Sequence, residues 1–193
     1  MCARCRGAPG QTNTMMIISK EQALEGAHRK AASLERRMPL RELKQLVASR
    51  SGAQRLFALF VMREQLAVSG LIKGYFRLAE GLVLDRDNNC RWQALIVIGE
   101  FLKQDPALVW PVIRIHAVSK DDDMRTAVAT VLLEHLLEYH LSRYWHRVRR
   151  AALTESPLFA DTLSRCAHFG LAQPHSREIR SVVARAKAKL MRN

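Results

Sequence analysis

The sequence from Asp85 to Tyr144 reads DRDNNCRWQALIVIGEFLKQDPALVWPVIRIHAVSKDDDMRTAVATVLLEHLLEYHLSRY. It contains two similar units, one after the other, and each begins with a short acidic and polar turn. An arginine and a run of apolar helix formers follow each turn, and Arg91 and Arg125 occupy matching places. A helical unit that recurs in this way predicts a fold built from stacked repeats.

The same pattern extends toward the N-terminus. Arg55 precedes Arg91 at a similar interval, and each of the three arginines is followed three positions later by a small apolar residue. The pattern resembles HEAT-type repeats, in which a turn containing aspartate leads into a helix that begins with an arginine. The resemblance implies that Asp87 and Asp121 are the turn aspartates, and that they form a structural ladder between repeats with Arg91 and Arg125.

Glycine, proline and capping residues divide the chain into helices with short connections, and no segment alternates like a half-buried strand. We therefore predict an all-α fold, a HEAT-like antiparallel helical-repeat solenoid of about eight or nine helices. Because no glycine or proline occurs between Asp121 and Pro157, the helix there either continues to about Ala152 or bends near Tyr139–Leu141. The expected helices begin near Ser19, Pro39, Leu56, Leu71, Asn89, Pro106, Asp121, Ser156 and Ser176.

The first residues differ in composition from the rest of the chain. Residues 1–16 offer little to bury, so we expect a disordered extension followed by a single helical domain over 17–193. Met15 and Met16 are alternative start sites. Basic residues near the N-terminus are not followed by an apolar run, which argues against a secretory signal. Cys2 and Cys5 have the spacing of half a zinc site or of a redox pair, but no second pair completes a zinc site, and a redox pair needs a folded helix N-terminus to lower the thiol pKa.

Charge is distributed unevenly along the chain. The net charge is +13 in total, with +7 over 1–55, −2 over 56–140 and +8 over 141–193. Basic ends favour acidic partners, so we expect an acidic protein surface or a nucleic acid as the partner. No apolar run is long enough to cross a bilayer, and the sparse cysteines suit a reducing compartment, so we expect no membrane insertion and a cytoplasmic location.

The most concentrated basic segment surrounds Trp145. Arg143, Arg147 and Arg150 are spaced i, i+4 and i+7, so they form one stripe on a helix, and Arg149 extends it sideways. Like charges this close repel one another, which indicates an anionic partner as much as a solvated surface. On the last helix, basic residues lie opposite the apolar face. The candidate binding residues are Arg143, Arg147, Arg149, Arg150, Arg177, Arg185 and Lys189.

Candidate catalytic and metal-binding residues are few. Glu134, His135, Glu138 and His140 suggest a metal site, but the two histidines lie too far apart around a helix to chelate one ion. No phosphate loop, nucleophile elbow or other catalytic signature occurs. We therefore predict no catalytic residue, no metal and no cofactor. Trp145 is the aromatic residue most open to a ligand, whereas Cys90 and Cys166 are expected to be buried thiols.

Two functions are consistent with these patterns. The first is a non-catalytic binding or scaffold module of the HEAT-repeat type, because repeat solenoids present a continuous surface to a partner. The alternative is a DNA-base glycosylase of the class that uses HEAT-like repeats. That enzyme needs a carboxylate and aromatic side chains on the same face as the basic residues. The position of such a cluster relative to the arginines therefore distinguishes the two.

Overall fold

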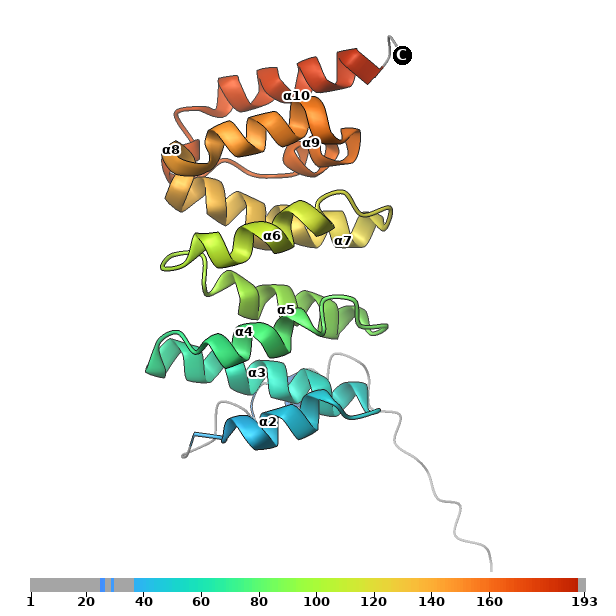
Figure 1. Ribbon diagram of the computed structural model, residues 1–193, viewed down its shortest axis with the longest axis vertical. Helices are drawn as coiled ribbons and strands as arrows, with labels where there is room; N and C mark the ends of the chain where they lie inside the picture. The colour runs from blue at the N-terminus through green and yellow to red at the C-terminus, as the bar shows by residue number, and fades with distance from the viewer. Residues whose placement is uncertain (1–24, 27–28, 30–36, 191–193) are drawn as a thin grey trace, which may run out of the picture.

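The computed structural model describes residues 25–26, 29 and 37–190 of the chain (Figure 1). The predicted extension over 1–16, with Cys2 and Cys5, and most of the predicted first helix lie outside the described residues. Every regular element in the described part is helical, which confirms the all-α class. None of these helices is long and apolar enough to cross a membrane.

The helices begin close to where the sequence predicts. Pro106 and Pro157 lie in the first turn of their helices, where a missing N–H costs nothing. The elements are α2 (Leu40–Val47), α3 (Gly52–Ser69), α4 (Lys73–Glu80), α5 (Asn88–Gly99), α6 (Pro106–His116), α7 (Asp122–Ala127), η1 (Val128–Leu133), α8 (Glu134–Arg150), η2 (Ala151–Glu155), α9 (Pro157–Ser164), η3 (Gly170–Ala172) and α10 (Ser176–Leu190).

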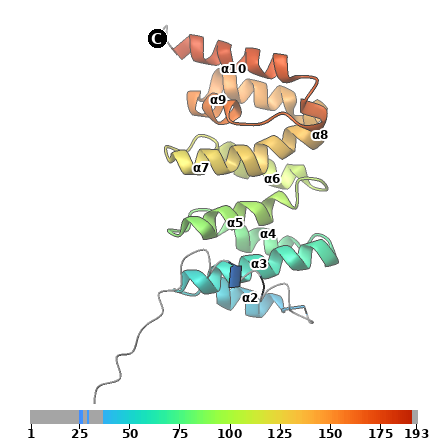
Figure 2. The same cartoon turned by 180° about the vertical axis from the view of Figure 1, so that it is seen from behind.

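The helices are stacked along the long axis of the molecule, from α2 at one end to α10 at the other (Figures 1 and 2). Two layers run along this axis. In one, α3 packs on α5, α5 packs on η1, and η1 contacts α9. In the other, α2 contacts α4, Arg114 of α6 pairs with Glu155 of η2, and Trp145 of α8 bonds Glu178 of α10. We call this second layer the basic layer, because its exposed residues include many arginines and lysines.

The long segment without glycine or proline changes direction at His140. This residue has φ −135° and ψ 29°, which is outside the helical region, so α8 consists of two helical parts joined at a kink. The His140 side chain bonds the Leu102 carbonyl through Nε2 at 2.8 Å, which ties the kink to the turn after α5. Of the two predicted alternatives, the bend near Tyr139–Leu141 is therefore confirmed. The π-helical segments η1 and η2 flank α8.

Aromatic side chains connect successive helices in the core. The buried rings of Phe76 and Phe101 meet edge to face at 5.3 Å. Farther along the chain, the centroid of the Trp110 ring lies 5.8 Å from that of Tyr144 and 6.4 Å from that of Phe159. One indole therefore links α6, α8 and α9. Cys90 and Cys166 are free, buried thiols, as the sequence predicts. Burial is the main reason that the pKa of Cys90 is raised to about 11.

Three turns of the chain share one hydrogen-bond pattern. Before α3, the Ser49 hydroxyl accepts from the Ser51 N–H at 3.1 Å, and before α7 the Ser119 hydroxyl accepts from the Asp121 N–H at the same distance. Before α5, the Asp85 carboxylate accepts from the Asp87 N–H at 2.8 Å. In each case the accepting residue lies six positions before the repeat arginine, so the three turns are structurally equivalent.

The same three positions organise the arginine contacts. Arg55 and Arg125 each donate through Nη1 to the carbonyl of the serine six residues earlier, at 2.8 and 2.7 Å. Arg55 also forms a bidentate pair with Asp85 of the next turn. In the turn before α7, the place that corresponds to Asp85 is occupied by Ser119, which has no carboxylate. Arg91 donates instead to Asp121 of that turn, at 2.6 Å. Each arginine thus reaches a carboxylate that follows it in the chain.

Asp87 has a different role from the one that the HEAT resemblance implies. Its side chain accepts from the Asn89 N–H at 2.9 Å and caps α5. The carboxylate that pairs with an arginine is Asp85, two positions earlier, because the helix cap already uses Asp87. Asp121 serves as both cap and arginine partner, since Ser119 provides no carboxylate.

Arg125 belongs to a larger cluster that the repeat pattern does not predict. Its Nε donates to Asp161 of α9 at 3.0 Å, and its Nη2 donates to Asp122 at 2.6 Å. Arg165 contacts the same two carboxylates at 2.8 and 2.7 Å. Two arginines and two aspartates therefore fasten α7 to α9 where the regular repeat spacing ends.

Candidate functional site

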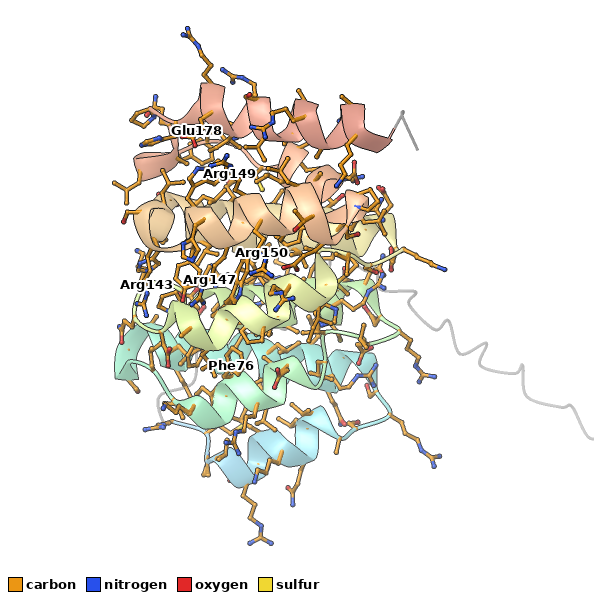
Figure 3. The ribbon with its side chains drawn as sticks, turned by 45° about the horizontal axis from the view of Figure 1, so that its top comes forward. Phe76, Arg143, Arg147, Arg149, Arg150 and Glu178 are labelled. Atoms are coloured by element: carbon orange, nitrogen blue, oxygen red, sulfur yellow. The ribbon has the colours of Figure 1, made fainter. Side chains whose placement is uncertain are left out.

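The candidate site begins with a row of arginines on the second part of α8. Figure 3 shows Arg143, Arg147 and Arg150 following one another along one edge of this helix. All three are exposed. We call these three residues the arginine row. Their spacing over seven residues corresponds to about 10 Å along a helix.

A buried aromatic ring lies beneath the first part of the row. The guanidinium carbons of Arg143 and Arg147 lie 5.6 and 5.4 Å from the centroid of the Tyr144 ring. Tyr144 is buried and packs on Trp110 of α6. The ring attracts each cation through its quadrupole and directs the two arginines along the helix surface.

No carboxylate of the described residues neutralises the arginine row. Within the described residues, none of its three members makes an ion pair, although Arg114 on neighbouring α6 pairs with Glu155 at 3.1 Å. Three exposed positive charges this close together repel one another. The row can therefore accept anionic groups at its guanidinium forks, which suit phosphate and carboxylate oxygens.

Arg149, predicted to extend the stripe, lies on a different edge of α8. Figure 3 shows it on the side toward Glu178 of α10 rather than with the arginine row. The pKa of Glu178 is held below its usual range, chiefly by the hydrogen bond from the Trp145 indole at 2.7 Å, and the Arg149 charge contributes. Trp145, the aromatic residue expected to be open, is therefore half-buried and engaged with a carboxylate.

The predicted residues of α10 are spread over that helix. Arg177, Arg185 and Lys189 are all exposed, and within the described residues none makes an ion pair. Lys189 lines a small cleft of 110 Å³ with Pro157 and residues 152–155 of η2. The structure thus brings Lys189 close to the C-terminal end of the arginine row. It provides no contact that joins Arg177 or Arg185 to that row.

Further basic residues come from helices that the sequence analysis left aside. The basic residues of α4 and α6 lie in the segment 56–140, which has a net charge of −2, so charge counting alone did not single them out, whereas those of α2 belong to the basic segment 1–55. Because every second helix belongs to the same layer, α2, α4 and α6 each add exposed cations to the basic layer. These are Arg41 and Lys44 on α2, Lys73 and Arg77 on α4, and Arg114 on α6.

The residues weighed as metal ligands have other partners. Glu134 is buried and accepts from the Ala167 N–H at 2.8 Å, while His135 bonds Glu138 at 2.8 Å. His140 is held by the Leu102 carbonyl. In the part of the chain that the structure describes, no three histidine, cysteine, aspartate or glutamate residues gather in a way that could hold a metal ion.

Comparison with known proteins provides no relative from which a function could be inferred. No family model, curated protein or solved structure matches the chain. Contacts, exposure and charge are therefore the basis for a functional proposal.

Proposed function

We propose that this protein is a non-catalytic binding module of the HEAT-repeat type, whose basic layer binds the phosphate backbone of nucleic acid. The equivalent turns at Ser49, Asp85 and Ser119, and the arginines that follow them, support a HEAT-like solenoid. Repeat solenoids use extended surfaces for recognition, because each repeat adds to a continuous face.

The observation that carries the proposal is the unpaired arginine row. Arg143, Arg147 and Arg150 are exposed, lie along one edge of α8 and have no carboxylate partner within the described residues. Over about 10 Å, one strand of duplex DNA presents about three phosphates, at about 3.4 Å of axis for each. The density of positive charge along the row is therefore comparable with the density of phosphate charge along one strand.

The distribution of charge favours nucleic acid over an acidic protein. Cations are found on α2, α4, α6, α8 and α10, so the positive charge extends along the stack rather than forming one compact patch. A nucleic acid is a uniformly charged rod and can follow such a surface, whereas an acidic patch on a folded protein is smaller. An acidic protein remains the partner that the experiment below would indicate if nucleic acid failed to bind.

The separation of two clusters favours binding over glycosylase activity. Glu178 and Trp145 are a carboxylate and an indole beside Arg149, and they bond one another. They lie toward α10, whereas Arg143 and Arg147 lie over Tyr144, which contacts α6. A glycosylase needs these groups on one surface, around one flipped nucleotide.

A salt titration tests the proposal. Fluorescence anisotropy would be measured with a labelled duplex, a labelled single strand and a labelled polyglutamate peptide. Binding of either nucleic acid should weaken steeply between about 50 mM and about 200 mM salt, because phosphate contacts release counterions. If only the peptide binds, the partner is an acidic protein. If none of the three binds even at low salt, the basic layer is not a binding surface.

A further inference from the structure

A second cleft lies apart from the arginine row, between the end of α9 and one side of α10. Its volume is 460 Å³, within the range of small-molecule sites. Leu163 and Ile179 are buried beneath it, and Val183 is half-buried beside them. These three side chains give the cleft an apolar floor. Arg180, Lys187 and His168 also line it and supply its polar groups.

Two free cations flank this floor. Arg180 and Lys187 are seven positions apart and lie on the same side of α10, with Val183 and Ala184 between them. Both are exposed, and within the described residues neither makes an ion pair or a side-chain hydrogen bond. The cleft therefore presents an apolar strip about 10 Å long with an unneutralised positive charge at each end.

The Arg180 end has a second hydrogen-bonding group. Burial lowers the pKa of His168, and the nearby Arg180 charge lowers it further against the smaller opposing effect of Glu134, which favours the neutral imidazole with its one N–H. Glu134, whose charge acts on His168, is buried and accepts from the Ala167 N–H, so it does not line the cleft. An anion would therefore find a guanidinium and an imidazole at this end of the cleft.

We propose that the cleft binds a small amphipathic carboxylate. The carboxylate group lies at Arg180 and His168, and the apolar body covers Leu163, Ile179 and Val183. Arginine suits this role because its planar fork donates two parallel hydrogen bonds to a carboxylate. The apolar floor excludes a bare inorganic anion as the preferred ligand, because such an ion would leave that surface uncovered. This site is independent of the nucleic-acid surface proposed above.

Octanoate is a suitable probe, with 1-octanol as its uncharged counterpart and inorganic phosphate as a charge without an apolar body. Each would be titrated into the ¹⁵N-labelled full chain and followed by amide chemical shifts. Octanoate should cause saturable shifts at Ala167 and Val183. Its apparent Kd should be at least about tenfold lower than that of 1-octanol, since a charged hydrogen bond stabilises binding by about 1.5–3 kcal/mol. Phosphate should cause no saturable chemical-shift change at these two amides.

Variants locate the charge that holds the carboxylate. Arg180→Ala should weaken octanoate binding by about tenfold or more, whereas Arg177→Ala removes the same charge from the same helix outside the cleft and should leave the Kd unchanged. Val183→Glu, which places a carboxylate over the apolar floor, should abolish the saturable shifts. Far-UV circular dichroism establishes that each variant is folded.

Three results would overturn the proposal. The first is an octanoate titration without saturable shifts at Ala167 and Val183 in the folded protein. The second is a Kd for 1-octanol equal to that for octanoate, which would make the charge irrelevant. The third is an equal loss of affinity in Arg177→Ala and Arg180→Ala, which would assign binding to the net charge of α10 rather than to this cleft.

Discussion

Arg55 of α3 and Asp85 of the turn before α5 form a bidentate ion pair. The Nε–Oδ2 distance is 2.6 Å and the Nη2–Oδ1 distance is 2.9 Å. Both side chains are more than nine-tenths buried, at 8% and 7% exposure. Burial alone would raise the pKa of Asp85, but hydrogen bonds from Arg55 and from the Asp87 N–H outweigh it and lower the pKa. The carboxylate is therefore charged in the folded protein and depends on its arginine.

Removing Arg55 should be costly. Arg55→Ala leaves the Asp85 charge buried without its partner, so the free energy of unfolding should fall by about 3–5 kcal/mol. Arg63→Ala is the matched control, because Arg63 pairs with Glu100 at 3.6 Å with both side chains more than two-fifths exposed. It should cost no more than about 1 kcal/mol. Urea unfolding measures both, and equal losses would argue against a structural role for the buried pair.

Arg125→Ala should cost less than Arg55→Ala. Arg125 is buried, but its partners Asp161 and Asp122 are partly exposed and keep the second arginine, Arg165. The loss should be about 1–3 kcal/mol, the range for a charged hydrogen bond that is partly compensated. Thermal unfolding provides the measurement. A melting temperature within error of the wild type would contradict a structural role for the ion pairs of Arg125.

Acid should weaken the fold through the same carboxylates. The pKa values of Asp85, Asp121, Asp122 and Asp161 are all lowered from the ordinary value of 3.8 in the folded chain. A carboxyl with a lowered folded pKa stabilises the protein fully above its unfolded pKa, and this contribution is lost as the pH falls through the folded value. We expect urea midpoints to stay level from pH 7 to about pH 5 and to fall below about pH 4.

The variant Asp85→Asn isolates the buried pair in that acid transition. It removes one of the four carboxyls, so its unfolding midpoint should be lower at neutral pH and should fall less steeply in acid than that of the wild type. If most of the wild-type loss instead occurred between pH 7 and pH 5, histidines rather than these aspartates would govern the stability.

Much of the helical order could be predicted because local chemistry determines it. Pro106, Pro157 and the Asp121 cap mark helix starts without reference to the rest of the fold. The kink at His140 was one of two alternatives, since no local residue enforces it. It is held by a hydrogen bond to Leu102, which is 38 residues earlier in the chain. A contact between residues that far apart in the chain cannot be recognised from the sequence pattern around His140.

The site was less predictable for the same reason. The arginine row follows from helical spacing alone, but the position of Arg149 depends on where α10 packs. Asp87 was the natural partner in the repeat pattern, and its use as a cap became visible only with the geometry of the turn. The cleft beside Arg180 joins two elements that have no shared motif, so residue types alone did not indicate it.

Gly170 should tolerate no side chain. Its φ is +49°, and a Cβ there would lie 2.7 Å from Cγ and 3.1 Å from the carbonyl oxygen of Glu138. Gly170→Ala should therefore lower the free energy of unfolding by about 1–3 kcal/mol. Gly81→Ala is the control, because Gly81 has a helical φ of −63° and its nearest neighbour is 3.5 Å away. It should be neutral or slightly stabilising in the same urea titration, and similar losses would contradict the steric argument.

The central claim, that the arginine row binds phosphates, is tested most directly by the salt dependence of DNA binding in two triple variants. One changes Arg143, Arg147 and Arg150 to alanine. The other removes the same charge from exposed turn residues by changing Arg50, Arg86 and Lys120 to alanine. The slope of log K against log salt should flatten by up to about three units in the first variant, about one for each phosphate that the protein no longer neutralises. The control should keep a slope close to that of the wild type. Equal slopes in the two variants would contradict the claim.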